Sequence, residues 1–408
     1  MKRNLALILL FTVCLSALTL MPALAQKQDG DPTGPAADTG KFIRMGKSAI
    51  PQHYIVVLDL DAVGVKGDLP ATAGMADELT ATYGGVTTNA YAYAINGFSA
   101  QMSEQEALKL SQDPRVKFIE EDSVMEATAT QTNPPWGLDR TGQRDLPLNN
   151  SYSYTTTGSG VNVYIIDTGI RRTHTQFGGR AFVGFDAIGD GQNTNDCNGH
   201  GTHVSGTVGG STYGIAKSVR LFAVRVLGCN GSGSNSGVIA GVDWVTANHI
   251  NPAVANMSLG GGASTALDSA VRNSIASGVT YAVAAGNSNV DASSSSPARV
   301  SEAITVGSST INDARSSFSN FGSVVDIFAP GSSILSSWFS SDTATATLSG
   351  TSMATPHVAG VAARFLQSNP GASPATVRNE IVNQSTTNHL SGIPSGTANR
   401  LLFWSSAR

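Results

Sequence analysis

Apolar strands alternate with helices along the part of the chain beyond Trp136. We expect strands at 161–167, 219–226, 253–258, 279–284 and 303–307, and helices at 201–209, 235–248, 264–277, 352–367 and 374–383. Strands that are apolar throughout are typical of a parallel sheet with helices on both faces. The pattern therefore predicts an α/β fold with a doubly wound, mostly parallel sheet. Such sheets collect their functional residues at the carboxyl ends of the strands.

A smaller unit precedes this region, at about residues 53–122. The expected elements are a strand at 54–60, a helix at 71–83, strands at 87–94 and 97–102, a helix opened by a Ser103/Glu106 capping box, and a strand at 116–120. This β-α-β-β-α-β order predicts a small α+β domain of the ferredoxin-like type. Residues 26–50 and 127–135 contain few large apolar side chains, and we expect both to be flexible spacers.

The first 25 residues have the pattern of a secretory signal peptide. Lys2 and Arg3 precede an apolar stretch that ends in Ala23-Leu24-Ala25, and the Ala-x-Ala sequence favours cleavage after Ala25 over a retained membrane anchor. We expect a secreted protein with no membrane attachment after cleavage. The net charge is −4, and the chain has no run of Lys or Arg, so we expect no nucleic-acid partner.

Cys14 is lost with the signal peptide, which leaves Cys197 and Cys229 in the mature chain. An even pair in an exported protein predicts one disulfide. The alternative is two free, buried cysteines.

Three segments carry candidate catalytic residues. Ser352 lies in GTSMATPHVAG (350–360), at the start of an expected helix, where unpaired N–H groups favour negative charge. Asp167 ends the strand VNVYIIDTGI, although a carboxylate there can also serve only to bond turn amides. His200 and His203 lie three residues apart in NGHGTHVSG, but the HExxH pattern of zinc sites is absent. A general base fits His200 better than a zinc ligand.

The chain order Asp167, His200, Ser352 is that of subtilisin-type catalytic triads. All three segments resemble those of the subtilases. The flanking sequences are similar to those of the proteinase K branch, in particular its bacterial, aqualysin-type members. The shared segments are PWGLDR, CNGHGTHVSG, CNGSGS, VANMSLGGG, YAVAAGN, SSFSN, DIFAPG and GTSMATPHVAG, which extend from about residue 134 to the end of the chain. Residues 53–122 resemble the inhibitor-like propeptide of that family.

The resemblance implies a role for each of these residues. Ser352 would attack the peptide carbonyl, His200 would transfer the proton and Asp167 would orient His200. Asn287 and the Ser352 N–H would form the oxyanion hole. Two edges would pair with the substrate backbone, formed by Gly231, Ser232 and Gly233 and by Ser258, Leu259, Gly260 and Gly261.

Ala284, Ala285 and Gly286 would line an uncharged P1 pocket, which favours apolar or aromatic P1 residues. A preference for basic P1 residues would need acidic residues there.

A structural calcium site is also implied, with Asp326 and the carbonyls of Ser301 and Ala303 as ligands. A second family calcium site would involve Asp139, Gln143 and Asn149. Gly142 occupies a position of that site where bacterial relatives have a carboxylate. Ser293 and Val324 replace the cysteines of a second disulfide.

We therefore expect a monomeric, secreted serine endopeptidase of broad specificity that acts on proteins and peptides. Its parts would be a signal peptide (1–25), a propeptide (26–126) that assists folding and inhibits the enzyme through its acidic end, and a catalytic domain (127–408). Self-cleavage is expected between about Glu126 and Pro134, with Glu126–Ala127 as the first candidate, and we expect no binding domain after it. The alternatives are a narrow processing protease and a non-catalytic binding module.

Overall fold

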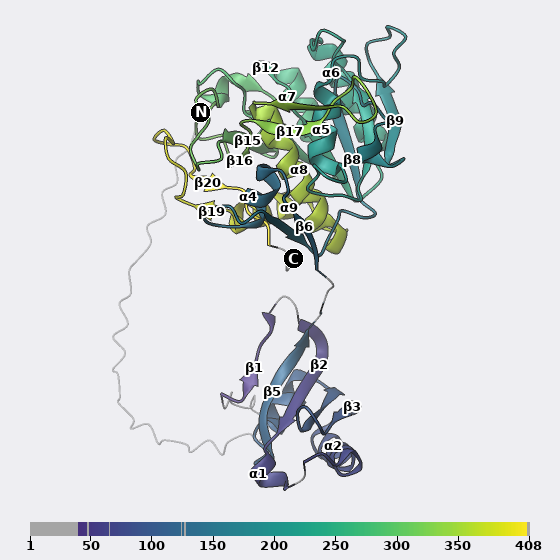
Figure 1. Ribbon diagram of the computed structural model, residues 1–408, viewed down its shortest axis with the longest axis vertical. Coiled ribbons are helices and arrows are strands. Elements are labelled where there is room, and N and C mark those ends of the chain that lie inside the picture. Colours follow the sequence, from purple (N-terminus) through teal and green to yellow (C-terminus); the bar gives the residue numbers. More distant parts are fainter. Residues whose placement is uncertain (1–39, 47–48, 65, 124, 126–127, 406–408) are drawn as a thin grey trace, which may run out of the picture. The chain divides into compact units, whose positions relative to one another are not determined.

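The computed structural model describes residues 40–46, 49–64, 66–123, 125 and 128–405. The chain forms two compact units, residues 1–125 and 126–408, and each is described by itself (Figure 1). The expected signal peptide and the Glu126–Ala127 bond lie outside the described residues. Among the described residues, no helix has the length and apolar character needed to cross a membrane.

The first unit is a five-stranded sheet with two main helices. Its strand order is β1-β5-β2-β4-β3, and its elements are β1 (Phe42–Ile43), β2 (Ala49–Leu58), the short α1 (Leu60–Val63), α2 (Leu69–Tyr83), β3 (Val86–Tyr91), β4 (Gly97–Gln101), α3 (Glu104–Leu110) and β5 (Val116–Ser123). Val56, Leu79 and Phe98 are fully buried between the sheet and the helices. The Ser103/Glu106 capping box is present at the start of α3. The predicted β-α-β-β-α-β order is therefore correct.

The expected spacer at 26–50 is wrong for its last part. β1 pairs in parallel with β5, and β2 begins at Ala49 rather than after His53. Phe42 is buried and packs on the ring of Tyr54. One aromatic side chain thus anchors a segment whose composition is otherwise typical of a linker.

The second unit is built on a nine-stranded sheet of order β19-β20-β16-β15-β13-β11-β8-β10-β9. Neighbouring strands are parallel except for the β19–β20 pair at the edge. The strands are β8 (Asn162–Asp167), β9 (Ala181–Asp186), β10 (Arg220–Arg225), β11 (Ala253–Met257), β13 (Thr280–Ala284), β15 (Ile304–Ser309), β16 (Ile327–Pro330), β19 (Thr386–Thr387) and β20 (Arg400–Leu401).

The order of the strands reverses at β8. β9 and β10 are added on one side of it, and β11, β13, β15 and β16 follow on the other. In sheets of this kind a crevice forms outside the carboxyl end of the strand where the order reverses. That end of β8 is Asp167.

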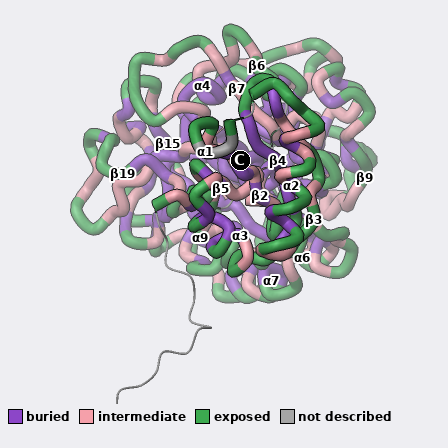
Figure 2. Tube along the Cα trace, turned by 90° about the horizontal axis from the view of Figure 1, so that it is seen from below, coloured by how far each residue is buried: buried purple, intermediate pink, exposed green. Residues whose placement is uncertain are grey.

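Helices cover both faces of this sheet, as predicted (Figure 1). α5 (His200–Gly209), α8 (Thr351–Ser368) and α9 (Pro374–Gln384) belong to one core, and α6 (Asn235–Asn248) and α7 (Thr265–Ala276) belong to the other. Val163 and Ile165 of β8 point into the first core, whereas Tyr164 and Ile166 point into the second. The buried stretches are purple in Figure 2.

The expected spacer at 127–135 is wrong for residues 129–132. Here β6 (Ala129–Thr132) pairs with β7 (Ser151–Tyr154), just before α4 (Trp136–Gly142). Gln131 accepts a hydrogen bond from Lys217 and donates one to the Thr212 carbonyl. This strand is fixed by backbone pairing and polar side chains, so it lacks the apolar pattern by which strands are recognised.

Candidate active site

Asp167 is fully buried at the carboxyl end of β8. Its Oδ1 accepts a hydrogen bond of 2.7 Å from the N–H of Thr168. The ring of His200 lies against the same carboxylate, with Nδ1 at 2.8 Å from Oδ1 and 2.9 Å from Oδ2. Nδ1 therefore carries a proton and donates it to Asp167, which leaves Nε2 on the opposite side of the ring.

His200 is the first residue of α5. The helix start approaches β8 so closely that a side chain at Gly201 would collide with the carbonyl of Gly169. Burial is the largest single influence on the pKa of His200 and lowers it, but the charge and hydrogen bond of Asp167, together with the charge of Asp196, outweigh burial. The net result is a pKa above the ordinary value of 6.5.

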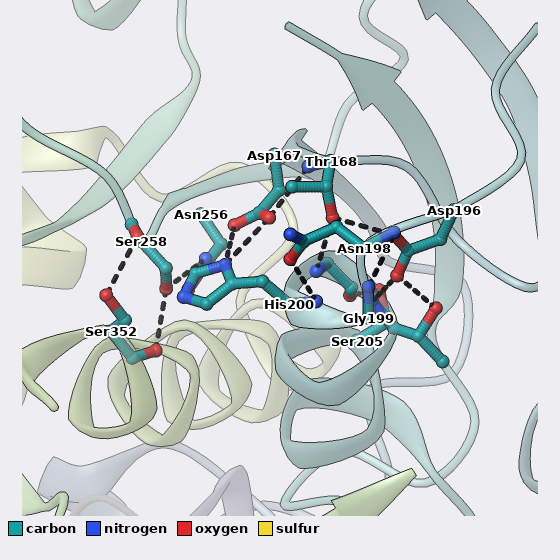
Figure 3. Close-up of polar contacts among 12 residues, drawn as sticks. Asp167, Thr168, Asp196, Asn198, Gly199, His200, Ser205, Asn256, Ser258 and Ser352 are labelled. Carbon is teal, nitrogen blue, oxygen red and sulfur yellow. Dashed lines mark hydrogen bonds and ion pairs between the residues drawn. The ribbon is translucent and has the colours of Figure 1, made fainter. Parts of the chain in front are cut away.

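Ser352 is the second residue of α8. Its Oγ donates to the carbonyl of Ser258 at 2.9 Å, while the Ser258 hydroxyl donates to the carbonyl of Ser352 at 2.8 Å. The side-chain amide of buried Asn256 donates to that same hydroxyl. Figure 3 shows the ring edge of His200 that faces away from Asp167 turned toward Ser352. No hydrogen bond joins Ser352 to His200 in this state.

Asn287 lies in the loop that follows β13 (Thr280–Ala284). Its Oδ1 accepts from the N–H of Thr351 at 2.8 Å and from the Thr351 hydroxyl at 2.9 Å. These two bonds occupy the amide oxygen and turn the Nδ2 group toward other acceptors. No described residue accepts a hydrogen bond from the N–H of Ser352. Two donors are thus available beside the Ser352 hydroxyl.

Two cavities flank Ser352 and His200. The first, of about 390 Å³, is lined by Gly231, Ser232, Gly233, Ser258, Leu259, Gly260, Gly261 and His200. The second, of about 400 Å³, is lined by Leu259, Gly260, Gly261, Ala284, Ala285, Gly286, Asn287 and Ser352. The structure thus brings together all the residues expected to contact a substrate.

Some lining residues were missed by sequence analysis. Leu227, Val238 and Leu267 form an apolar wall of the first cavity. Ser295 and Ala298 add an uncharged lining to the second. They come from separate parts of the chain, and no local pattern distinguishes them from ordinary core or turn residues.

Cys197 and Cys229 form a disulfide, so the alternative of two free cysteines is wrong. The bond ties the loop before His200 to the loop that contains Gly231. Asn198 strengthens this link, because its side-chain amide donates to the carbonyl of Cys229 at 3.1 Å. The two loops form neighbouring parts of the first cavity.

The expected calcium ligands lie around the start of β15. The buried Asp326 accepts a hydrogen bond of 2.9 Å from the N–H of Thr305. Thr305 lies in β15, which begins directly after Ser301 and Ala303 in the chain. A carboxylate and two carbonyls are donors that suit calcium. The guanidinium of Arg378 already forms an ion pair with Asp326, so a calcium ion would have to displace it.

Hydrogen bonds engage only part of the second expected calcium site. Oδ2 of Asp139 accepts from the N–H of Asn150, next to Asn149, at 2.8 Å, whereas Oδ1 of Asp139 is buried with no hydrogen-bond partner in the described part of the chain. The side-chain amide of Gln143 donates hydrogen bonds to the carbonyls of Asp145 and Pro147.

His203 does not lie in a zinc-binding cluster, since its Nε2 contacts the backbone carbonyls of Ile334 and Ala346. Among described residues, the only three-residue metal-ligand cluster is Asp190 with the two disulfide cysteines.

Comparison with known families decides the class of protein. The model of the "Subtilase family" matches residues 158–399. The chain belongs to the subtilase family. A second model, "Peptidase inhibitor I9", matches residues 53–128 of this subtilase.

Individual relatives agree with this assignment. The "Extracellular serine proteinase" of Thermus sp. (strain Rt41A) is 49% identical, over 99% of this chain and 99% of its own length. The "Alkaline serine exoprotease A" of Vibrio alginolyticus is 53% identical, over 87% of this chain and 68% of its own. A crystal structure of a cold adapted subtilisin-like serine proteinase matches with a TM-score of 0.65 and 56% identity, over 67% of this subtilase and 98% of that chain. The protein is a secreted serine endopeptidase with an inhibitor-like propeptide domain.

Proposed function

We propose that this subtilase cleaves peptide bonds through an acyl-enzyme formed on Ser352. His200 accepts the Ser352 proton at Nε2 and later gives it to the leaving amine, and Asp167 holds the ring in the tautomer that this requires. The observation that carries the proposal is the Asp167–His200 pair, with the free edge of the ring turned toward Ser352. The Ser352 hydroxyl must rotate away from Ser258, a change of the kind that apo active sites undergo when substrate binds.

The negative charge that develops on the substrate oxygen needs donors fixed in advance. We assign this role to Nδ2 of Asn287 and the N–H of Ser352. Thr351 supports the assignment, because its two hydrogen bonds to Asn287 orient the amide. The N-terminus of α8 adds a favourable dipole at the same place.

We infer broad specificity with a preference for apolar or aromatic P1 residues. The proposed P1 cavity, bounded by Ala284, Ala285 and Gly286, has no charged lining residue. The glycine-rich edges at 231–233 and 258–261 leave room for a substrate backbone to pair as an extended strand. A peptide library should be cut after many sequences with large apolar P1 residues. A profile dominated by one sequence would instead indicate a processing protease.

We propose that cleavage before Ala129 releases a propeptide that ends near Glu126, because Ala129 already pairs within the second unit as the start of β6. The intact masses of the secreted wild type and of Ser352→Ala test this proposal and the role of Ser352 together. The wild type should appear as a chain that starts near residue 127, and the variant should keep its propeptide. If the variant is cut at the same bond, another protease performs this step. Activity of Ser352→Ala on a peptide substrate would overturn the proposed nucleophile.

Subtilases commonly bind structural calcium, and we propose that Asp326, Ser301 and Ala303 hold one ion here. The ion would compete with Arg378 for the Asp326 carboxylate. Calcium should therefore raise the thermal midpoint of the Ser352→Ala protein at lower concentration when Arg378→Gln is also present. A midpoint that does not respond to calcium in either protein would refute the site.

A further inference from the structure

Asp196 is a buried carboxylate in the loop that precedes α5. Its two oxygens accept five hydrogen bonds, all from N–H or hydroxyl groups of described residues. Ionised carboxylates are almost never buried unless paired. A charge held here by neutral donors alone therefore calls for an explanation beyond packing.

One oxygen of Asp196 fixes the start of the helix. Oδ2 accepts from the N–H of Thr202 at 2.9 Å and from its hydroxyl at 2.6 Å. Gly199, at the N-cap position, provides no side-chain cap. A side chain there would collide with the indole of Trp338, and its φ of 113° is one that other residues rarely adopt. Asp196 thus performs from three residues upstream the capping that residue 199 cannot.

The other oxygen fixes the residues next to the candidate catalytic pair. Oδ1 accepts from the N–H groups of Asn198 and Gly199 at 2.9 and 2.8 Å, directly before His200. It also accepts from the hydroxyl of Thr168 at 2.9 Å, directly after Asp167. Figure 3 shows Asp196 on the far side of Thr168 and Asn198 from the His200 ring.

Thr168 completes the connection. Its hydroxyl oxygen accepts from the N–H of Gly201 at 2.9 Å, and its own N–H donates to Asp167 at 2.7 Å. The carboxylate and the imidazole of the catalytic pair come from different elements, β8 and α5. Asp196 and Thr168 therefore form a bridge between the backbone beside Asp167 and the backbone beside His200.

We propose that Asp196 is a positioning residue for peptide hydrolysis, which sets the Asp167–His200 geometry through Thr168 and stabilises the charged imidazolium. The inference rests on the triad proposed above. Two carboxylates act on His200: Asp167 from β8 and Asp196 from the preceding loop. His203, on the same helix, has its pKa lowered to about 4 by burial, so it is uncharged in the pH range where His200 titrates. Both carboxylates act to raise the pKa of His200.

The test compares Asp196→Asn, Thr168→Val and Thr168→Ser in the mature enzyme, with active sites counted by titration. Asp196→Asn should lower kcat by about 10- to 100-fold with little change in KM, since a misplacement of 1 Å costs about that much. It should also move the acid limb of the kcat/KM profile to lower pH, because a negative charge beside His200 is lost. Thr168→Val should lower kcat and leave the acid limb in place, and Thr168→Ser should restore kcat.

If Asp196 only caps α5 and has no role in catalysis, a different result is expected. Asp196→Asn would then lower the thermal midpoint but leave kcat and the acid limb unchanged below that temperature, and this outcome overturns the proposal. If Asp196→Asn does not fold, an unchanged kcat in Thr168→Val overturns it instead. Failure of the proposed triad is separate, since it would appear as activity in Ser352→Ala whatever the Asp196 variants do.

Discussion

Two buried histidines behind the active site should make the catalytic unit sensitive to acid. His203 and His357 are both fully buried. Nε2 of His203 contacts the carbonyls of Ile334 and Ala346, and Nδ1 of His357 contacts the carbonyl of Met353. The other nitrogen of each ring is buried with no partner. A second proton would therefore enter a position with no acceptor.

The size of the effect follows from the pKa values. Burial is the largest cause that lowers the pKa of each histidine from 6.5 to about 4. In the range between these values the unfolded chain binds more protons than the folded one, so the free energy of unfolding falls as the pH falls. At 1.36 kcal/mol per pKa unit, each histidine removes about 3 kcal/mol between pH 6.5 and pH 4. The full contribution is present above pH 6.5.

Guanidinium unfolding of the Ser352→Ala protein between pH 4 and pH 8 measures this dependence. All four tryptophans lie in the second unit, at positions 136, 244, 338 and 404, so their fluorescence reports on that unit alone. His357→Gln should remove a large share of the pH dependence, because it removes one of the two buried imidazoles. An equal slope in wild type and His357→Gln would refute the reasoning.

Three further results are expected. Asn287→Ala should lower kcat by about 10²–10³-fold and leave KM little changed, which is the loss known for one such donor in a subtilisin. A rise in KM with an unchanged kcat would contradict the oxyanion role. The acid limb of kcat/KM should have its midpoint above 6.5, because only neutral His200 accepts a proton and its pKa is raised; a midpoint below 6.5 would show that burial outweighs Asp167. Asp313→Asn should destabilise the Ser352→Ala protein by about 3–5 kcal/mol, since Arg140 is left buried without its bidentate partner. Asn keeps both the shape and the positive φ of Asp313, so a loss under about 1 kcal/mol would mean that the ion pair adds little.

Five strands of the central sheet, β8, β10, β11, β13 and β15, could be predicted because their stability comes from apolar burial, which is visible in sequence. β8 and β11 are buried along their whole lengths. The helices α6, α7 and α9 each begin with a serine N-cap, at Ser234, Ser264 and Ser373. β9, β19 and β20 were not predicted, and β16 was missed although it is fully buried, because it is only four residues long. β6, which is fixed by polar contacts, was also missed. The hairpin of β17 (Ile334–Ser337) and β18 (Thr345–Leu348) was missed as well, because only Ile334 and Leu348 at its open end contribute to the apolar core and the rest of both strands is small or polar apart from the exposed Leu335.

The candidate site divides in the same way. Asp167, His200 and Ser352 lie in segments whose residue types and order indicate their chemistry. Asp196 has no such signal, because its role depends on hydrogen bonds from Thr168, 28 positions earlier in the chain. Sequence patterns therefore reveal candidate reactive groups, whereas the groups that hold these in position are harder to recognise from sequence.

The Cys197–Cys229 bond makes the shape of the substrate cleft depend on the cellular compartment. The reducing cytoplasm keeps thiols apart, whereas the oxidising exterior permits the bond. Until export, the loop that contains Gly231 would be tied to the loop before His200 only by weaker contacts such as the Asn198 amide. The enzyme therefore acquires the disulfide that braces its cleft only after it leaves the reducing cytoplasm.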